Sequence, residues 1–267
     1  MTTAPAASTA PASPARPVAL VRRPSARLAE GELTHRQRES IDIDLARTQW
    51  AAYVAALEAA GFTAREVGAA DALADSVFVE DTVVVFGDIA VITSPGAVSR
   101  RPETEASASA VRSLGLDVRE ISLPGTLDGG DVLKVARTVY VGRGGRTNLE
   151  GIRQLAAFVE PAGYVVVAVP VTRVLHLKSA VTALPDGCVI GYEPLVDDAS
   201  VFPSFLAVPE ETGAAVVVLP DGGVLMASSA PESARLFEQR GLHVVTVDVS
   251  EFEKLEGCVT CLSVRVR

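Results

Sequence analysis

The sequence repeats one pattern of secondary structure at a nearly fixed spacing. Runs of β-branched residues flank short turn-forming segments in four places, which is typical of β-hairpins. The turns lie at Gly87-Asp88, Ala136-Arg137, Pro185-Asp186-Gly187 and Asp221-Gly222-Gly223. From Asp88 to Arg137, and again from Arg137 to Asp186, the spacing is 49 residues, and Asp221 follows 35 residues later. A period of this length indicates a radial repeat.

Helices and further strands fill the intervals between the hairpins. Hydrophobic spacing and glycine stop signals predict helices at residues 47–61, 103–115, 148–159 and 231–241. The second and third of these precede two more predicted strands, DVREISL and YVVVAVPV. The terminal runs PVALVRRP and CVTCLSVRVR are expected to pair with each other, which closes a ring of five units and removes exposed sheet edges. The fold class is therefore α/β, with an open α/β sheet carrying antiparallel hairpins as the alternative.

Composition limits the class of protein. The chain has 267 residues, of which 48% are hydrophobic, so we expect a single domain over residues 17–267. Residues 1–16 are rich in alanine, proline, serine and threonine and are expected to form a disordered tail. The net charge of −9 argues against a nucleic-acid partner. The longest apolar run is too short to span a membrane, and three cysteines fit a cytoplasmic protein better than a disulfide scaffold.

Three clusters carry groups that could do chemistry. In DSVFVEDT, Asp75, Glu80 and Asp81 surround an apolar triplet, and a strand that ends here would bring the carboxylates to one pocket. In TLDGGDVL, two glycines between two aspartates leave the backbone bare for a close approach. In VLHLKS, His176 begins an apolar segment. The alternatives are an exposed strand end, a tight hairpin entry and a core histidine; His35 and His243 are assigned no role.

Two arginines and two cysteines complete the candidates. Arg100 and Arg146 fall in comparable loops after successive hairpins, where converging guanidinium groups would suit a carboxylate, although solvated loop arginines are the alternative. Cys258 and Cys261 form a C-x-x-C pair that could be a metal knuckle, a redox pair, or one nucleophile with a bystander. If CVTCLSVRV is a strand, their side chains point to opposite faces.

Six of these segments together resemble one enzyme family. The segments DSVFVEDT, GAVSRRPETE, TLDGGDVL, GRTNLEG, VLHLKS and GCVTCLSVR occur in the order found in dimethylarginine dimethylaminohydrolases, over about residues 18–267. The resemblance implies a five-bladed α/β propeller of ββαβ repeats, the pentein fold. It also implies hydrolysis of Nω-methylated arginines to citrulline, a small cationic substrate, and no cofactor or metal ion.

The resemblance also assigns roles to individual residues. Cys261 is similar to the family's nucleophile, His176 to its catalytic histidine and Asp128 to the acidic partner of that histidine. The substrate contacts that it implies are Leu33, Asp75, Glu80, Asp81, Arg100, Arg146 and Leu255. Cys258 occupies a position that the family does not use catalytically, and Glu256 stands where relatives often carry aspartate.

These assignments favour one nucleophile with a bystander at the C-x-x-C pair. A zinc knuckle needs about four ligands, and no second close Cys/His pair exists in the sequence. A redox pair usually opens a helix, whereas this segment alternates like a strand. The remaining alternatives are another guanidine hydrolase, such as an arginine or agmatine deiminase, and a non-catalytic amino-acid-binding or metal-binding protein. The enzyme is expected to be a monomer or a homodimer.

Overall fold

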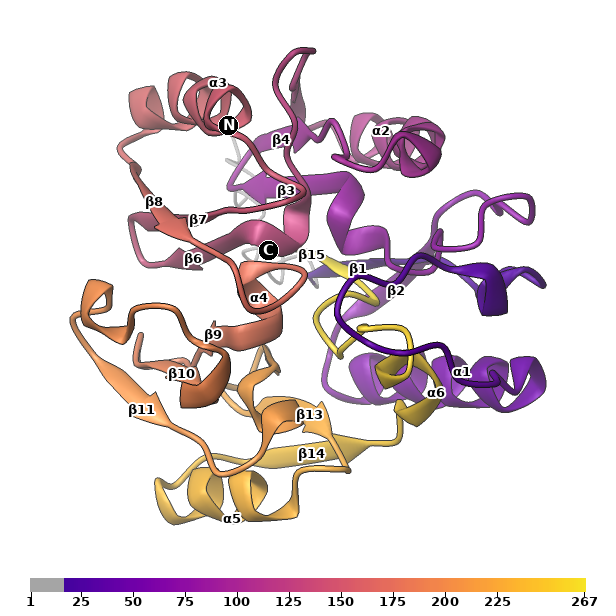
Figure 1. The fold of residues 1–267 in the computed structure, drawn as a ribbon, viewed down its shortest axis with the longest axis vertical. Coiled ribbons are helices and arrows are strands. Elements are labelled where there is room, and N and C mark those ends of the chain that lie inside the picture. Colours follow the sequence, from indigo (N-terminus) through magenta and orange to yellow (C-terminus); the bar gives the residue numbers. More distant parts are fainter. Residues whose placement is uncertain (1–16) are drawn as a thin grey trace, which may run out of the picture.

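Five three-stranded sheets are arranged in a ring in the computed structural model, which describes residues 17–267 (Figure 1). The predicted tail at residues 1–16 lies outside the described residues. In each sheet the middle strand pairs antiparallel with one neighbour and parallel with the other. Similar units of this kind, repeated around an axis, are the propeller that the sequence predicts.

The sheets follow the predicted hairpins. The strands are β1 (Val18–Val21), β2 (Thr63–Glu66) and β15 (Val264–Val266); β3 (Val83–Phe86), β4 (Ile89–Ile92) and β5 (Asp117–Glu120); β6 (Val132–Val135), β7 (Thr138–Arg143) and β8 (Val165–Pro170); β9 (Val181–Ala183), β10 (Val189–Gly191) and β11 (Phe205–Ala207); β12 (Val216–Val218), β13 (Val224–Ala227) and β14 (Val244–Val247). The four predicted turns join β3 to β4, β6 to β7, β9 to β10 and β12 to β13.

The two ends of the chain close the ring. Strand β15 pairs antiparallel with β1 in the register Val18↔Val266, Ala19↔Arg265 and Leu20↔Val264. In Figure 1 the yellow β15 lies beside the indigo β1. This pairing confirms the predicted ring and rules out the open sheet.

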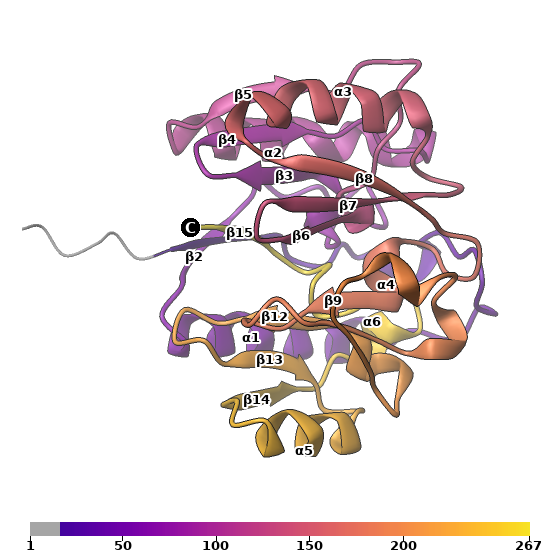
Figure 2. The ribbon, with the colours of Figure 1, turned by 90° about the vertical axis from the view of Figure 1, so that its left-hand side faces the viewer.

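The predicted helices are present, with small differences at their ends. They are α1 (Ile43–Ala59), α2 (Thr104–Ser113), α3 (Leu149–Val159) and α5 (Pro231–Gln239), with two short additions, α4 (Leu177–Ala180) and α6 (Ser250–Glu253). Helix α1 begins earlier than expected because the Asp42 carboxylate accepts hydrogen bonds from the N–H groups of Asp44 and Leu45. Figure 2 shows α3 and α5 at opposite ends of the molecule, on the outside of their sheets.

The fourth unit is shorter than the others because it lacks a full helix. Between β10 and β11 the chain forms only the 3₁₀ turns Glu193–Leu195 and Ala199–Val201. The following hairpin therefore comes after 35 residues rather than 49. The irregular spacing in the sequence is thus the sign of a missing helix rather than of a break in the ring.

Two segments expected to be strands are turns. Residues Val79–Thr82 form a 3₁₀ turn. One reason is that the carbonyl groups of Asp75 and Phe78, just before it, accept hydrogen bonds from the Arg100 guanidinium instead of from a neighbouring strand. At the C-terminus, the N–H of Cys261 donates to the Cys258 carbonyl at 3.1 Å. The CVTC run is consequently a turn that precedes β15, and the expected alternation of its side chains is wrong.

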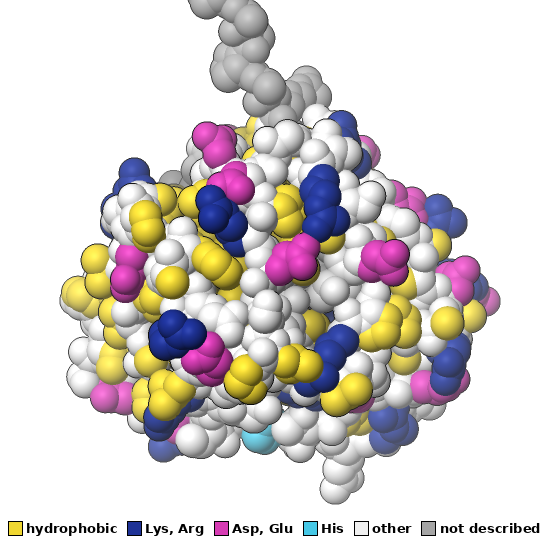
Figure 3. All heavy atoms as spheres, turned by 90° about the horizontal axis from the view of Figure 1, so that it is seen from above, with side chains coloured by type: hydrophobic (Ala, Val, Ile, Leu, Met, Phe, Trp, Pro, Cys, Tyr) yellow, Lys and Arg dark blue, Asp and Glu magenta, His cyan; other side chains and the backbone are white. Residues whose placement is uncertain are grey.

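Apolar side chains fill the space between each helix and its sheet, as Val139, Val141 and Leu155 do beneath α3. On the side of the molecule that carries α2 and α3, basic and acidic side chains lie interspersed among small apolar areas (Figure 3). Within residues 17–267, none of the helices combines the length and the apolar character needed to cross a membrane.

Candidate active site

Most of the predicted site residues line one cleft, which we call the cysteine cleft. Its walls are Glu32, Asp75, Phe78, Asp81, Arg100, Arg146, Leu175, His176, Leu255, Glu256, Gly257 and Cys261. The free volume inside is only about 20 Å³. A ligand of the size of an amino acid therefore enters only if part of the wall moves.

His176 lies between two carboxylates at the start of α4. Its Nε2 is 3.0 Å from Asp128 Oδ2, and its Nδ1 is 3.8 Å from Asp81 Oδ1. Burial alone would lower the pKa of His176, but the charges of Asp81, Asp128 and Asp131, together with the Asp128 hydrogen bond, raise it to about 9. The imidazole is therefore protonated at neutral pH and can give up a proton.

The two glycines of TLDGGDVL allow this arrangement. A Cβ atom on Gly130 would lie 2.6 Å from His176 Nδ1 and 2.7 Å from Asp81 Oδ1, and one on Gly129 would lie 2.0 Å from the Glu80 carbonyl oxygen. Only glycine permits this approach, so the predicted close contact is confirmed. The second aspartate of the motif, Asp131, was not assigned a role. Its carboxylate accepts hydrogen bonds from the Leu177 N–H at 2.9 Å and from the Thr147 hydroxyl at 2.6 Å.

Arg100 belongs to a buried ion-pair network. Its Nη1 donates to Asp81 Oδ2 at 2.7 Å, and its Nε and Nη2 donate to Glu103. Although burial would raise the pKa of Asp81, His176, Arg100 and the Gly130 N–H lower it to about 2. Most donors of Arg100 are thus engaged by the protein itself. This arrangement differs from the expected pair of free guanidinium forks.

Arg146 pairs with a carboxylate that is partly exposed to solvent. Its Nη2 is 3.0 Å from Glu32 Oε2, and the Glu32 side chain is 39% exposed. Glu32 was not singled out in the sequence, where it stands in a charged stretch without a motif. Its own N–H donates to Asp75 Oδ2 at 3.1 Å, which joins Asp75 and Arg146 through one residue.

The segment 31–36 contributes Glu32 to the cleft wall, and its other end is held by Glu256, which also lines the cleft. The carboxylate of Glu256 accepts hydrogen bonds from the N–H groups of Thr34, His35 and Arg36. Glu256 has a left-handed backbone, with φ of 59°, which is uncommon for a residue other than glycine. Leu33, in the same segment, packs against the apolar core and is not one of the residues that line the cleft. Leu255 does line it.

The two cysteines of the C-x-x-C pair lie side by side, contrary to expectation. The CVTC turn brings Cys258 Sγ to 3.4 Å from Cys261 Sγ, and all three cysteines are free thiols. The hydrogen bond with Cys258 is the main cause that raises the pKa of Cys261 well above its usual range, followed by burial and by the charges of Cys258, Glu80 and Asp81. The thiol of Cys261 is therefore neutral in the free protein.

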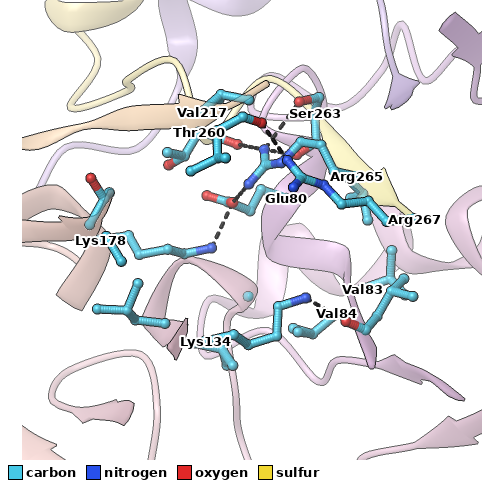
Figure 4. Close-up of a pocket in the computed structure, with 18 of the residues that line it drawn as sticks. Glu80, Val83, Val84, Lys134, Lys178, Val217, Thr260, Ser263, Arg265 and Arg267 are labelled. Carbon is cyan, nitrogen blue, oxygen red and sulfur yellow. Dashed lines mark hydrogen bonds and ion pairs between the residues drawn. The ribbon is translucent and has the colours of Figure 1, made fainter. Parts of the chain in front are cut away.

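Glu80 lies apart from the cleft wall, in a cavity along the centre of the ring that we call the axial cavity (Figure 4). Its Oε1 is 2.6 Å from Lys178 Nζ and 3.0 Å from Arg265 Nη2. Its Oε2 is buried and has no hydrogen-bond partner among the described residues. The adjacent N–H of Glu80 donates to the Cys261 carbonyl at 3.2 Å, so the residue lies beside the nucleophile candidate.

Asp81, Asp128 and His176 also have the composition of a metal site, with ligand atoms within 4.8 Å of one another. Each of these groups already has a partner: Asp81 pairs with Arg100, and Asp128 accepts from His176 and from the Gly96 N–H. A raised pKa on the histidine favours a proton over a metal ion at this position. The geometry suits proton transfer beside a thiol.

No family model matches the sequence. It is 62% identical to N(G),N(G)-dimethylarginine dimethylaminohydrolase of Streptomyces coelicolor over 249 residues, which cover 93% of this chain and 96% of the relative. A citrulline complex of the Pseudomonas aeruginosa enzyme, in a cysteine-to-serine variant, matches 94% of this chain and 99% of its own, with a TM-score of 0.87 and 32% identity. The N-terminal domain of an arginine dihydrolase from cyanobacteria shares the fold, with a TM-score of 0.83 at 19% identity, over 94% of this chain and 98% of its own.

The first two similarities extend over nearly the full length of both chains, at identities that preserve family membership as well as fold. Cys261, His176 and two of the carboxylates quoted from the sequence, Asp75 and Asp81, meet in one cleft of that shared fold. On this evidence the chain belongs to the dimethylarginine dimethylaminohydrolase family.

Proposed function

We propose that this enzyme hydrolyses asymmetric dimethylarginine and monomethylarginine to citrulline and dimethylamine or methylamine, with Cys261 as the nucleophile. The observation that carries the proposal is the meeting of the Cys261 thiol, the His176 imidazole and the Asp81 carboxylate in one cleft. The name of the S. coelicolor relative and the citrulline in the P. aeruginosa structure support the same substrate class.

The substrate guanidinium is held by carboxylates. Asp81 is fixed by Arg100 and carries its charge at neutral pH, and Glu80 has one oxygen without a partner. Asp81 lines the same cleft as Cys261, where its charge orients the guanidinium carbon for attack, and Glu80 adds negative charge from the neighbouring axial cavity. In this assignment Arg100 positions Asp81 and does not itself bind the substrate carboxylate.

The amino-acid end of the substrate lies toward Arg146 and Asp75. A substrate carboxylate would replace Glu32 on Arg146 and form a bidentate contact there. Asp75 then meets the α-amino group, together with backbone groups of Leu33 and Leu255. Because Glu32 belongs to segment 31–36, its displacement also supplies the movement that the small free volume of the cleft requires.

The first chemical step forms a covalent intermediate. When the substrate guanidinium binds, the Cys261 thiol releases its proton to solvent. The thiolate attacks the guanidinium carbon and forms the C–S bond, and the C–N bond to the methylated amine then breaks. The amine leaves only if it takes up a proton. His176 supplies that proton, since its raised pKa keeps it charged at neutral pH.

The second step releases citrulline. His176, now neutral, accepts a proton from a water molecule that attacks the same carbon. The C–S bond breaks and returns the sulfur to the enzyme. Asp128 holds the imidazole in one orientation through both steps by its 3.0 Å contact with Nε2.

Citrulline release tests the proposal directly. Asymmetric dimethylarginine, monomethylarginine, arginine and agmatine are assayed side by side, with Cys261→Ser as the inactive control. We expect turnover of the two methylated arginines and none by the variant. Turnover of agmatine or unmethylated arginine alone would assign a deiminase activity instead.

The acid–base role has its own test. His176→Gln should retain substrate binding but lose turnover. Tryptic digestion after Lys254 and Arg265 isolates the peptide 255–265, on which a trapped adduct at Cys261 would be seen by mass spectrometry. A kcat for His176→Gln equal to that of the wild type would remove His176 from the mechanism.

The same proposal includes a cytoplasmic enzyme in which residues 17–267 form one catalytic unit, either monomeric or homodimeric. The free thiols support a reducing compartment. Sedimentation of the active enzyme decides between the two oligomeric states, and limited proteolysis that leaves residues 17–267 active supports the single unit.

A further inference from the structure

The turn that carries the nucleophile brings a second thiol next to it. Cys258 Sγ lies 3.4 Å from Cys261 Sγ and 3.3 Å from the Thr260 hydroxyl. The mechanism uses only one of the two sulfurs. A second thiol in contact with a catalytic thiol has a direct chemical consequence, because the two can be oxidised together.

The backbone of the turn suits a disulfide. The N–H of Cys261 donates to the Cys258 carbonyl, which makes the four residues a β-turn with its ends less than about 7 Å apart. Disulfides span Cα separations of roughly 4.4–6.8 Å, with sulfurs about 2.05 Å apart. The two sulfurs can therefore close their remaining gap by side-chain rotation.

The two thiols open on different cavities. Cys261 lines the cysteine cleft, whereas Cys258 lines a neighbouring space of about 450 Å³, which we call the outer cavity. The outer cavity is lined by basic residues, among them Arg36 and Arg173, and by acidic residues, of which Glu211 pairs with Arg36. A small oxidant can thus reach Cys258 without passing through the substrate position.

We propose that Cys258 and Cys261 are a redox-modification site, at which a peroxide converts the pair to an intramolecular disulfide and reversibly switches off the enzyme. This inference rests on the proposed function only in assigning catalysis to Cys261. The formation of the bond itself depends on the turn geometry alone.

The chemistry balances with hydrogen peroxide as the oxidant. The thiolate of one cysteine attacks a peroxide oxygen, breaks the O–O bond and becomes a sulfenic acid, and one water molecule leaves. The neighbouring sulfur then attacks the sulfenic sulfur, forms the S–S bond and releases a second water molecule. Two thiols lose two hydrogens in total, and peroxide is reduced to two water molecules. A dithiol reductant reverses the change by exchange.

Cys258 is the thiol that reacts first. Its hydrogen bond with Cys261 is the main cause that lowers the pKa of Cys258 to about 7, with a further contribution from Thr260. The lowered pKa increases the share of Cys258 that is thiolate, which is the reactive form, and Cys258 is the thiol that opens on the outer cavity. Cys261 then resolves the sulfenic acid, so the nucleophile ends as a disulfide rather than as an irreversible sulfinic acid.

Peptide mapping tests the inference without reference to activity. Purified enzyme is treated with hydrogen peroxide, alkylated, and digested with trypsin, so that both cysteines fall in peptide 255–265 and Cys188 falls in another. We expect peptide 255–265 to lose the mass of two hydrogens and to escape alkylation, while the Cys188 peptide is alkylated. Dithiothreitol should restore both the reduced mass and citrulline release.

Two variants sharpen the test. In Cys258→Ser, peroxide should inactivate the enzyme more slowly than the wild type, because the thiol that reacts first is gone, and peptide 255–265 should show no two-hydrogen loss; Cys258→Ala serves if the serine variant does not fold. Cys188→Ser, at a buried position in another part of the core, should behave as the wild type.

The failures of the two proposals can be told apart. A disulfide in an enzyme that releases no citrulline overturns the proposed function and leaves the redox site intact. Peroxide inactivation of an active enzyme without the two-hydrogen loss overturns the redox site, as does inactivation of Cys258→Ser at the rate of the wild type.

Discussion

Replacing Asp128 with asparagine should lower the pKa of His176 while leaving the packing around position 128 nearly unchanged. Asp128 is fully buried, accepts from His176 Nε2 at 3.0 Å and from the Gly96 N–H at 2.8 Å, and asparagine can keep the second contact. The change therefore removes a charge and one charge-assisted hydrogen bond with little loss of packing.

The expected magnitude follows from the pKa of His176, which rises from 6.5 to about 9 on folding. At about 1.36 kcal/mol per pKa unit, this rise is worth about 3 kcal/mol of stability. Because the folded pKa is the higher one, the stability is fully present below about pH 6.5 and is lost as the pH rises through about 9. A hydrogen bond to a charged group contributes about 1.5–3 kcal/mol. Asp128→Asn should thus lower the pKa of His176 by about one to two units.

Nuclear magnetic resonance titration of the imidazole signals measures this shift, and urea unfolding between about pH 6 and pH 9 measures the linked stability. Asp221→Asn is the matched control, because Asp221 pairs with the exposed His243 at 3.1 Å. The control should leave the His176 titration unchanged. A pKa for His176 that stays near 9 in Asp128→Asn would refute the role given to this carboxylate.

Three further changes separate the roles of neighbouring groups. Arg146→Ala should raise the KM for methylarginine about 30-fold, the equivalent of about 2 kcal/mol, but should scarcely affect a decarboxylated analogue; equal effects would exclude a carboxylate contact. Arg100→Ala should instead destabilise the fold by about 3–5 kcal/mol, because it leaves the buried carboxylates of its network unpaired, as chemical unfolding will show. Glu256→Gln should speed hydrogen exchange of the amides at residues 34–36, whose acceptor it weakens; unchanged exchange would mean that Glu256 does not hold this segment. Ultraviolet titration of Cys258→Ser, in which Cys261 is the only thiol of the pair, should find that the Cys261 thiolate forms only above the usual range of a cysteine in the free enzyme and forms at lower pH with an inert guanidinium ligand; a Cys261 thiolate already formed in the free variant at neutral pH would contradict this.

The ring could be predicted from the sequence because the turn and helix signals of each unit lie close together in the chain. The turn at Gly87-Asp88 and the residues that begin and end α5 depend only on neighbours in the chain, so they can be recognised without knowledge of the fold. The turn at Val79–Thr82 could not be predicted in this way. The carbonyl groups of Asp75 and Phe78, just before the turn, accept hydrogen bonds from Arg100, and a side chain so much further along the chain leaves no periodic signal.

The catalytic candidates were found because their motifs are short and continuous, but their partners were not. Glu32 and Glu256 act through contacts with Arg146 and with the backbone of residues 34–36, from segments that have no shared pattern. The placement of Cys258 was wrong for a related reason. Alternation over CVTCLSVRV suggested a strand, whereas Arg265 and Tyr53 take the carbonyl groups of the turn.

The two reactive groups of the cleft are held in opposite states, and carboxylates contribute to both. Asp81 is the main cause that raises the pKa of His176, which keeps the imidazole charged. The hydrogen bond with Cys258 and burial raise the pKa of Cys261, and the charges of Glu80 and Asp81 add to that rise. In the proposed mechanism a bound guanidinium offsets these charges, so we expect Cys261 to become a thiolate when its substrate is present. In the free enzyme the reactive thiolate is that of Cys258, whose pKa is lowered to about 7. An oxidant should therefore react first at Cys258, which the proposed mechanism does not use, whereas the substrate reacts at Cys261.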